Sequence, residues 1–170
     1  MAIDPRHVGR RYGPFRTTVC AERIRDFATA VAGGVPGHFG TATGEPHPLT
    51  VDEQEAAKSR YGSLVAPPTF GVTFAMHPFA LACADPEIGL DLVRLLHAEQ
   101  EFEYHSVVRP GDVLTTTGEV VEVRSKGLLD FLTVQSETRN AAGELVLVGR
   151  WSAVVRNEAP PRSEAGPAKA

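Results

Sequence analysis

The sequence predicts a single α+β domain, with helices in its first half and an antiparallel sheet in its second half. Two observations lead to this prediction. Apolar residues recur at helical spacing in the first half, and the period changes to two from His97 onward. The 170 residues, of which 42% are hydrophobic, are enough for one domain with its own core. We assign this domain to residues 1–157 and expect residues 158–170, which are rich in Pro and Ala, to form a disordered tail.

The N-terminal part combines an edge strand, a helix and a loop. Residues 11–20 have strand character and lead into a helix that Gly33-Gly34 should end. The apolar face of this helix consists of Ile24, Phe27, Ala28 and Val31. Residues 33–44 are rich in Gly, Pro and Thr, which favours a long loop. Thr50 and Glu53 match a capping box and predict a short second helix with Thr50 as its N-cap.

A buried helix is predicted after Pro67-Pro68, because the stretch from Thr69 to Leu81 is apolar on nearly every side. Proline is well tolerated in a first helical turn, where its missing N–H would have no partner. Pro78 lies inside the stretch and should kink or end the helix. A further helix is expected from Asp85-Pro86. Its apolar face would be formed by Ile88, Leu92, Leu95 and Leu96.

Four strands are predicted in the second half, and the last three form an antiparallel meander on tight turns. The strands cover residues 97–105, 113–123, 128–138 and 144–155, with turns at Pro110-Gly111-Asp112, Gly127 and Gly143. In the first strand, alternation predicts a charged face of His97, Glu99, Glu101 and His105. Solvated or paired charges explain this row better than a metal site, since no short His/Cys cluster supports zinc. We expect neither a metal nor a cofactor.

Composition excludes several classes of partner. The net charge is −4 with acids and bases interspersed, which argues against a nucleic-acid-binding surface. The longest apolar stretch is interrupted by His77 and Pro78 and is too short to cross a bilayer. The N-terminus has no apolar segment of the kind found in signal peptides. Cys20 and Cys83 lie in apolar contexts and are expected to be buried reduced thiols, which is typical of a cytoplasmic protein.

Four segments in the same order along the chain resemble MaoC-like hydratase/dehydratase domains. They are Ala56-Ala57-x-Ser59-Arg60-Tyr61-Gly62, Ala66-Pro67-Pro68-Thr69-Phe70, His97-x-Glu99-Gln100-Glu101-Phe102-x-Tyr104-His105 and Pro110-Gly111-Asp112. The resemblance covers residues 11–155 and is strongest to the branch named for the N-terminal half of MaoC-type dehydratases. It implies a hotdog fold, in which an antiparallel sheet wraps around a long central helix, here with an extra N-terminal helix and a long loop.

The family's catalytic Asp and His come from a loop written D-x-N-P-x-H, which here reads Glu45-Pro46-His47-Pro48-Leu49-Thr50. Glu45 takes the place of the aspartate and Thr50 that of the histidine. A threonine cannot act as a base near neutral pH. The resemblance therefore leaves Glu45 with His47, or with His38 in the preceding loop, as the candidate catalytic residues. For both histidines, the alternative interpretation is a solvent-exposed loop residue.

In active members, backbone N–H groups at the start of the central helix hold the thioester oxygen as it gains negative charge. This chain has Pro67-Pro68 at that position, and proline has no N–H to donate. The amides of Thr69 and Phe70 remain able to hold a carbonyl oxygen. Pro68, Thr69 and Phe70, together with Thr50, are thus the predicted substrate-binding residues.

Three functions are compatible with this resemblance. The first is an (R)-specific enoyl-thioester hydratase or 3-hydroxyacyl-thioester dehydratase, acting on acyl groups of coenzyme A or acyl carrier protein with an altered catalytic loop. The second is a non-catalytic, substrate-binding hotdog paired with a catalytic MaoC partner, and the third is an acyl-thioesterase or a specialised biosynthetic enzyme. We expect a homodimer or a heterodimer with another hotdog subunit, because a lone hotdog leaves a sheet edge unpaired.

Overall fold

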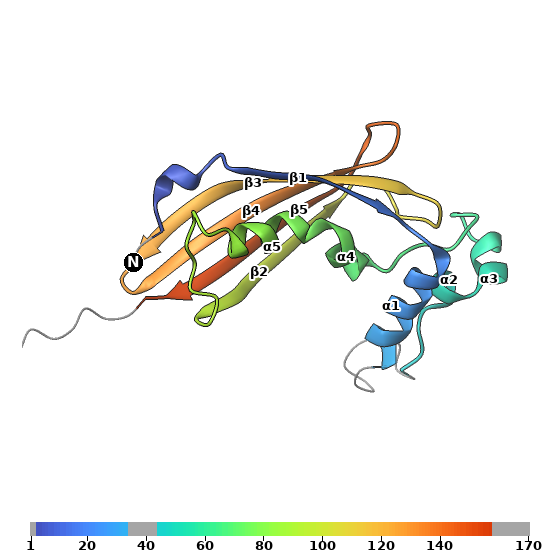
Figure 1. Cartoon of the computed structure of the whole chain (residues 1–170). Coiled ribbons are helices and arrows are strands. Elements are labelled where there is room, and N and C mark those ends of the chain that lie inside the picture. The colour runs from blue at the N-terminus through green and yellow to red at the C-terminus, as the bar shows by residue number, and fades with distance from the viewer. Residues whose placement is uncertain (1–2, 34–43, 158–170) are drawn as a thin grey trace, which may run out of the picture.

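The computed structural model describes residues 3–33 and 44–157, which form one five-stranded antiparallel sheet with short helices along one face (Figure 1). The strands are β1 (Arg11–Thr18), β2 (Leu95–Tyr104), β3 (Val113–Lys126), β4 (Leu129–Arg139) and β5 (Leu145–Arg156). Their order across the sheet is β1-β3-β4-β5-β2. The prediction of an α+β fold is therefore confirmed. The expected tail, residues 158–170, lies outside the described residues.

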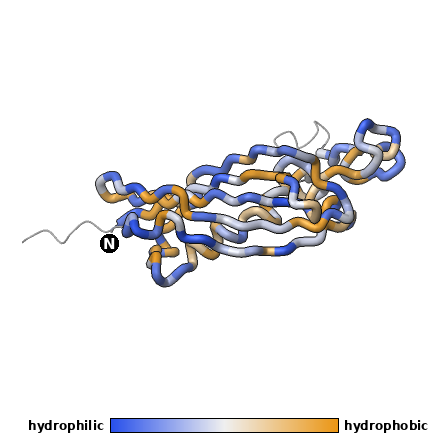
Figure 2. The backbone as a smooth tube through the Cα atoms, turned by 90° about the horizontal axis from the view of Figure 1, so that it is seen from above, coloured by the Kyte–Doolittle hydropathy of each residue, from blue (hydrophilic) through white to orange (hydrophobic). Residues whose placement is uncertain are grey.

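Strands β3, β4 and β5 form the predicted meander, and β1 is an edge strand as predicted. Figure 2 shows these strands running side by side along the length of the molecule. Gly127 and Gly143 lie in the two connecting turns with φ of 62° and 81°, a left-handed conformation that glycine adopts at little cost. Side chains alternate along β3 to β5 between the buried helix side and the outer face.

The helical elements of the described residues are η1 (Pro5–His7), α1 (Ala21–Gly33), α2 (Pro48–Val51), α3 (Glu53–Lys58), η2 (Pro68–Gly71), α4 (Val72–Ala75) and α5 (His77–Ala84). Segments η2, α4 and α5 follow one another as the central helix, which is broken at Met76. Pro78 lies in the first turn of α5, so the predicted interruption is confirmed. Helices α1, α2 and α3 gather at one end of the sheet (Figure 1). Within these residues, no helix is long and apolar enough to span a membrane.

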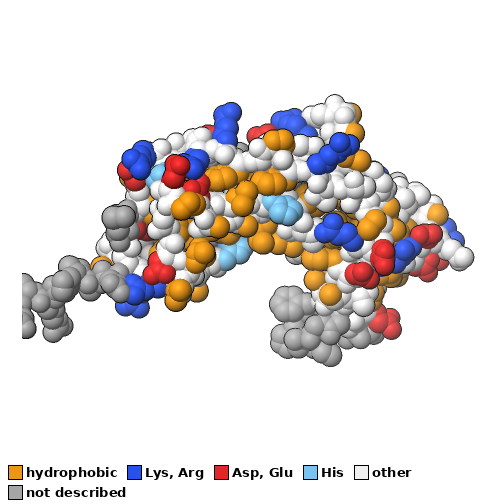
Figure 3. Space-filling view, in the orientation of Figure 1, with side chains coloured by type: hydrophobic (Ala, Val, Ile, Leu, Met, Phe, Trp, Pro, Cys, Tyr) orange, Lys and Arg blue, Asp and Glu red, His pale blue; other side chains and the backbone are white. Residues whose placement is uncertain are grey.

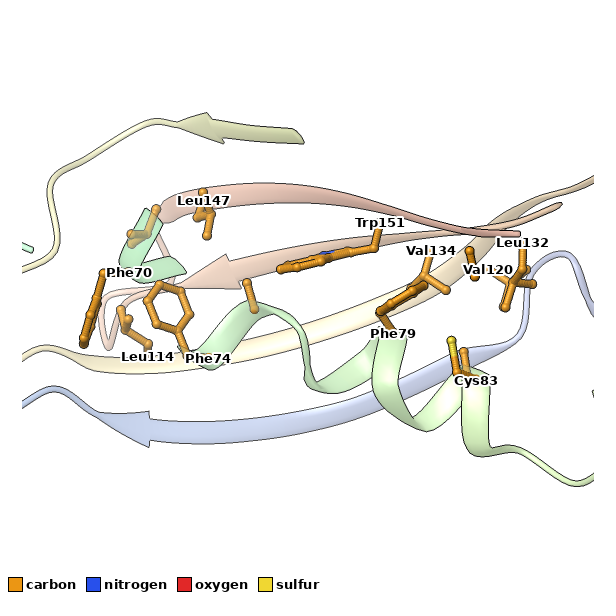
Figure 4. Close-up of a cluster of buried hydrophobic side chains, with 14 of the residues drawn as sticks. Phe70, Phe74, Phe79, Cys83, Leu114, Val120, Leu132, Val134, Leu147 and Trp151 are labelled. Atoms are coloured by element: carbon orange, nitrogen blue, oxygen red, sulfur yellow. The ribbon is translucent and has the colours of Figure 1, made fainter. Parts of the chain in front are cut away.

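Trp151 on β5 lies at the centre of the core and is fully buried. Its indole N–H donates to the Oγ of Ser136 over 3.0 Å, so the polar group of the ring is satisfied. The ring packs against Phe102 at 5.2 Å and Phe79 at 6.1 Å between ring centroids. Figure 4 shows Trp151 facing the helical segments that carry Phe74 and Phe79. The sheet and the central helix therefore share one apolar core.

His97 does not share a face with Glu99, so that prediction was wrong. The register between β2 and β5 shifts between His97 and Glu99. This bulge turns His97 toward the central helix, where its ring lies 5.2 Å from that of Phe79. Glu99 and Glu101 line the outer face of the sheet beside Arg150. The charged face is thus shorter than alternation predicted.

The predicted helix after Asp85 was also wrong, because residues 86–94 form turns instead. Gly89 has a φ of 69°, a left-handed conformation that interrupts a helix. Leu95 pairs with Val155 across the edge of the sheet, so β2 has already begun where the third helical turn was expected. Helical spacing of apolar residues did not produce a helix here, because the pairing of β2 with β5 favours turns followed by a strand.

The two cysteines lie in different environments. Cys83 is buried in α5 as predicted, whereas Cys20 is exposed immediately before α1, contrary to the prediction. Val19, the neighbour of Cys20, is almost fully buried, so alternation at the end of β1 turns the Cys20 side chain outward.

Candidate functional site

The loop that replaces the family's catalytic motif forms two helix caps. His47 is the N-cap of α2, and its Nδ1 accepts a hydrogen bond from the Leu49 N–H over 3.2 Å. Thr50 is buried inside α2, and its Oγ1 donates to the His47 carbonyl oxygen over 2.6 Å. The predicted N-cap role of Thr50 was therefore wrong. Asp52 caps α3 instead, with Oδ1 accepting from the Gln54 N–H over 2.8 Å, since aspartate is a preferred N-cap residue.

Glu45 and His47 are both exposed residues of the segment that leads into α2. One imidazole nitrogen of His47 is already engaged by the helix that it caps. Water addition to an enoyl thioester needs two titratable groups that converge on one water molecule in a site protected from bulk solvent. The structure does not place Glu45 and His47 in such a site, and His38 lies outside the described residues.

A cavity of about 370 Å³ opens beside the start of the central helix. One wall consists of η2 and the two residues before it. The other wall consists of the end of β2 and the residues that follow it, up to Val108. The lining residues are Ala66, Pro67, Pro68, Phe70, Gly71, Tyr104, His105, Ser106, Val107 and Val108. The Ala66 N–H donates to the Val108 carbonyl oxygen over 2.9 Å and joins the two walls. A largely apolar lining with few polar groups is typical of a small-molecule site.

The start of the helix has few free backbone donors. Pro67 and Pro68 have no N–H, and the Phe70 N–H donates to the Pro67 carbonyl oxygen over 2.9 Å. In this 3₁₀ turn, Thr69 therefore carries the N–H that has no acceptor within the helix. Among the predicted binding residues, Pro68 and Phe70 line the cavity. Thr69, between them in the sequence, is exposed, and Thr50 lies in α2.

Tyr104 borders the cavity beside the helix, although no pattern in the sequence marked it as a site residue. Its hydroxyl donates a hydrogen bond to the Pro68 carbonyl oxygen. Burial raises the pKa of Tyr104, although the Gly71 N–H faces the phenol oxygen and acts in the opposite direction. A Cβ on Gly71 would lie 2.8 Å from the Tyr104 Oη and 2.9 Å from Leu147. The phenol thus contacts the helix backbone at a position where only glycine leaves room for it.

His105 lies on the rim of the same cavity, at the end of β2. Its Nε2 is 3.3 Å from the Oε1 of Glu103, and both side chains are substantially exposed. An exposed pair of this kind contributes little to stability. Tyr104 and His105 are therefore the titratable residues in the lining of the cavity.

The other hollows of the described residues have more charged linings. A hollow of about 490 Å³ lies beside Arg11, Glu119 and Glu137. Another, of about 290 Å³, lies near Asp130 at the far end of β4. Burial would raise the pKa of Asp130, but hydrogen bonds from Ser125, Asn157 and Ile3 outweigh it and lower the pKa. Within residues 3–33 and 44–157, no three His, Cys, Asp or Glu side chains gather as metal ligands would.

Comparison with known proteins identifies the family of this chain. Residues 6–148 match the family described as "FAS1-like, dehydratase domain region". A UPF0336 protein of Thermobifida fusca (strain YX) is 34% identical over 161 residues, which are 94% of this chain and 98% of the relative.

Two solved structures illustrate the similarity of the fold. The HadBC (3R-hydroxyacyl-ACP dehydratase) complex of Mycobacterium tuberculosis matches with a TM-score of 0.71 and 25% identity, over 87% of this chain and 96% of that chain. The MaoC-like dehydratase of Rhodospirillum rubrum matches with a TM-score of 0.60 and 28% identity, over 90% of this chain and 94% of that chain. The chain therefore belongs to the FAS1-like dehydratase family and has the hotdog fold of the MaoC-like dehydratases.

Proposed function

We propose that this chain is the substrate-binding subunit of an enoyl-thioester hydratase or 3-hydroxyacyl-thioester dehydratase, in which a second hotdog supplies the catalytic carboxylate and imidazole. One observation carries the proposal: neither Glu45 nor His47 is among the residues that line the apolar cavity at the helix start. The sequence left open whether the altered loop is itself the catalyst or whether a partner supplies the catalytic groups. The geometry supports the binding role better.

The cavity suits an acyl thioester in both of its parts. Its apolar lining favours burial of a hydrocarbon chain by the hydrophobic effect. A thioester carbonyl oxygen needs a hydrogen-bond donor, and the Thr69 N–H at the helix start is a candidate. Coenzyme A and acyl carrier protein carry the same thioester arm, so both remain candidate carriers. The similarity to a dehydratase that is described as a complex is consistent with a two-subunit enzyme.

A second hotdog would also cover apolar surface that this chain leaves exposed. A band of hydrophobic side chains runs across the face of the molecule occupied by the central helix (Figure 3). The exposed apolar residues are Met76 at the break of the central helix, Leu81 of α5, Leu92 and Val93 before β2, and Leu96 in β2. Because β2 is an edge strand, a partner at this edge would also pair its free backbone groups. These features support a homodimer or a heterodimer with another hotdog.

The test measures binding and hydration separately. The purified chain alone should bind a saturated acyl-CoA by calorimetry but should not hydrate crotonyl-CoA or a longer enoyl-CoA. Hydration should appear when a hotdog protein with an intact Asp-x-Asn-Pro-x-His loop is co-purified with it. Glu45→Gln and His47→Ala should leave the activity of that complex unchanged.

The opposite outcome would identify an autonomous enzyme. In that case, the chain alone hydrates the enoyl-CoA, and Glu45→Gln and His47→Ala each lose on the order of a hundredfold or more in rate. Release of a free coenzyme A thiol from the acyl-CoA, with no hydration, would instead point to a thioesterase.

A further inference from the structure

We propose that the free edge of β2 selects its partner by charge: it fits a hotdog whose edge strand presents lysine or arginine, and it pairs less tightly with a second copy of this chain. The inference rests on the two-hotdog arrangement proposed above and specifies the chemistry of the second subunit. It concerns Glu99, Glu101 and Glu103, on the face of β2 that is turned away from the central helix.

The first observation is the alternation of side chains along β2. Gln100 lies opposite the buried Trp151 of β5 and therefore belongs to the helix side of the sheet. The three glutamates alternate with that side, so they lie on the outer face, and all three are exposed. Within residues 3–33 and 44–157, Glu103 has an ion-pair partner in His105, whereas Glu99 and Glu101 have none.

The second observation is a row of residues that lie side by side across the five strands of the sheet. Arg11 of β1 lies opposite Glu119 of β3, and its Nε is 2.7 Å from the Oε2 of Glu119. Glu119 lies opposite Gln135 of β4, which accepts a hydrogen bond from its own neighbour, Arg150 of β5, over 3.3 Å. Arg150 lies opposite Glu101, where the row ends. Bases and acids thus alternate around Gln135, and the next position, on a partner strand, favours a base.

The carboxylates at this edge outnumber the bases. A hollow of about 150 Å³ on the outer face is lined by Glu99, Glu101, Glu122, Thr133, Arg150 and Ser152. Three carboxylates therefore surround a single guanidinium. The excess negative charge attracts lysine or arginine on an approaching strand and repels its acidic side chains.

A second copy of this chain cannot supply those bases. In a two-fold dimer, residue i of one copy lies opposite residue j of the other, and j lies opposite i. Residues that lie opposite each other in an antiparallel pair share a face of the sheet. An axis at residue 101 therefore places Glu101 opposite its own copy, and an axis at residue 100 places Glu99 opposite Glu101. Every such axis from residue 99 to residue 103 opposes two glutamates, and like charges in this position destabilise the pair.

Charged side chains can also protect an edge strand from any partner, but two features favour pairing here. Strand β2 is 10 residues long, whereas protected edge strands are often very short. Exposed apolar side chains lie beside and within it, since Val93 is 95% exposed and Leu96 is 67% exposed. Their burial would favour association, and the glutamates would then determine which strand associates.

The experiment uses a charge-reversed copy of the chain, Glu99→Lys/Glu101→Lys, as the partner with a basic edge. Wild type carrying a fluorophore on the exposed Cys20 is titrated with unlabelled wild type or with the variant, and fluorescence anisotropy gives each Kd. The Kd of the variant should be lower by about tenfold or more, because each opposed pair changes from repulsion to attraction. In about 0.5 M NaCl the two values should converge, since salt screens exposed charges.

Glu22→Lys/Asp26→Lys is the matched control. It changes the net charge by the same amount at two exposed positions of α1, and it should bind labelled wild type no more tightly than a second wild-type copy does. Circular dichroism verifies that each variant is folded. Glu99→Gln/Glu101→Gln removes the carboxylates without adding bases and should self-associate more tightly than the wild type, which tests the inference even if the lysine variant does not fold.

The outcomes separate the charge preference from the proposed function. Equal dissociation constants for the two partners at low salt would show that the glutamates do not select the partner. If labelled wild type binds neither copy, the edge of β2 is protected from every strand, and the inference is refuted as well. Failure of the proposed function would appear elsewhere, as the absence of acyl-CoA binding in calorimetry while the two titrations still differ.

Discussion

At the residue scale, Gly118 determines how closely the central helix approaches the sheet. It lies on the helix side of β3, between Thr116 and Val120, which are both buried. A Cβ at this position would lie 2.3 Å from the Cβ of Pro78. The break in the central helix is thus packed onto a strand position without a side chain, and neither residue can change size independently of the other.

Gly118→Ala is therefore expected to destabilise the protein by about 1–3 kcal/mol, because the added methyl group forces the helix away from the sheet. Equilibrium unfolding in urea measures this difference in free energy. Thr117→Ala is the matched control, since Thr117 is exposed on the opposite face of the same strand, and its effect should stay within about 0.5 kcal/mol. Equal destabilisation by the two variants would contradict the packing argument.

The two cysteines should differ in their reactivity toward a thiol reagent. Cys20 is exposed, whereas burial of Cys83 raises its pKa to about 11 from an ordinary value of 9.0. Because the thiolate is the reactive form, native protein should label at one thiol at pH 8 and at two thiols in denaturant. Cys20→Ser should abolish labelling of the native protein. Rapid labelling of native Cys20→Ser would show that Cys83 is accessible.

The same pKa shift predicts the direction of a pH effect on stability. The neutral thiol of Cys83 is favoured in the folded state, so its contribution is complete below the ordinary thiol pKa. It is lost as the pH rises through about 11. Cys83→Ala should therefore flatten the fall in stability between about pH 9 and pH 11, and a curve parallel to that of the wild type would contradict this account.

At the element scale, the meander could be predicted because its signals are local. The predicted strands 113–123, 128–138 and 144–155 became Val113–Lys126, Leu129–Arg139 and Leu145–Arg156. Each hairpin has its own alternation and its own turn glycine. Local conformations that depend on residues far away in the sequence could not be predicted from such signals. Residues 86–94 are not helical because β2 pairs with β5, and a bulge reverses His97 without any sign in the sequence.

The candidate site was only partly predictable for the same reason. The segment at Pro68 was recognised because a resemblance points to the start of the central helix. Tyr104 is 36 positions further along the chain, and its hydroxyl reaches the Pro68 carbonyl oxygen only in the folded protein. Glu45 and His47 were selected by alignment, which cannot show whether their side chains face a cavity. The capping hydrogen bond of His47 and its exposure appear only in three dimensions.

Strand β1 is joined to the end of α5 by a polar cluster around Asp85. Its Oδ2 accepts from the Tyr12 hydroxyl and from the Arg10 Nε, both over 2.7 Å. Burial would raise the pKa of Asp85, but hydrogen bonds from Tyr12 and the Glu87 N–H, together with the charge of Arg10, outweigh it and lower the pKa. Burial and the bond to Asp85 raise the pKa of Tyr12 to about 12, so its hydroxyl stays protonated at neutral pH.

Asp85→Asn should consequently reduce stability by about 1–3 kcal/mol at pH 7, since a charged acceptor is lost from two hydrogen bonds. Because the folded-state pKa is lowered, the contribution is present above the ordinary carboxyl pKa and is lost as the pH falls through the lowered value. Urea unfolding at pH 7 and in acid measures this trend. Asp91→Asn, at an exposed ion pair with Arg94, should have little effect at either pH. A difference between Asp85→Asn and wild type that grows in acid would refute the assignment.

At the scale of the whole molecule, the sheet covers only one side of the central helix. Met76, at the break of the central helix, and Leu81 of α5 are exposed. Figure 3 shows a band of hydrophobic side chains on the face that this helix occupies. Val93, just before β2, and Leu96, within β2, add exposed apolar surface at the free edge of the sheet. Contiguous apolar surface of this kind marks an interaction site more often than a monomer surface.

The double variant Met76→Lys/Leu81→Lys should therefore reduce the molar mass of the assembly, because pairing would bury two ammonium groups without partners. Sedimentation equilibrium measures this mass, and the wild type should be dimeric at concentrations at which the variant is monomeric.

Thermal unfolding of the wild type should depend on protein concentration, since assembly stabilises the folded chain by mass action, and the variant should lose that dependence. Leu128→Lys, at an exposed leucine in the turn between β3 and β4, should change neither property. A variant that keeps the mass of the wild type would show that this face is not where the partner binds. The dimer would then form through another surface, for example along the free edge of β2 alone.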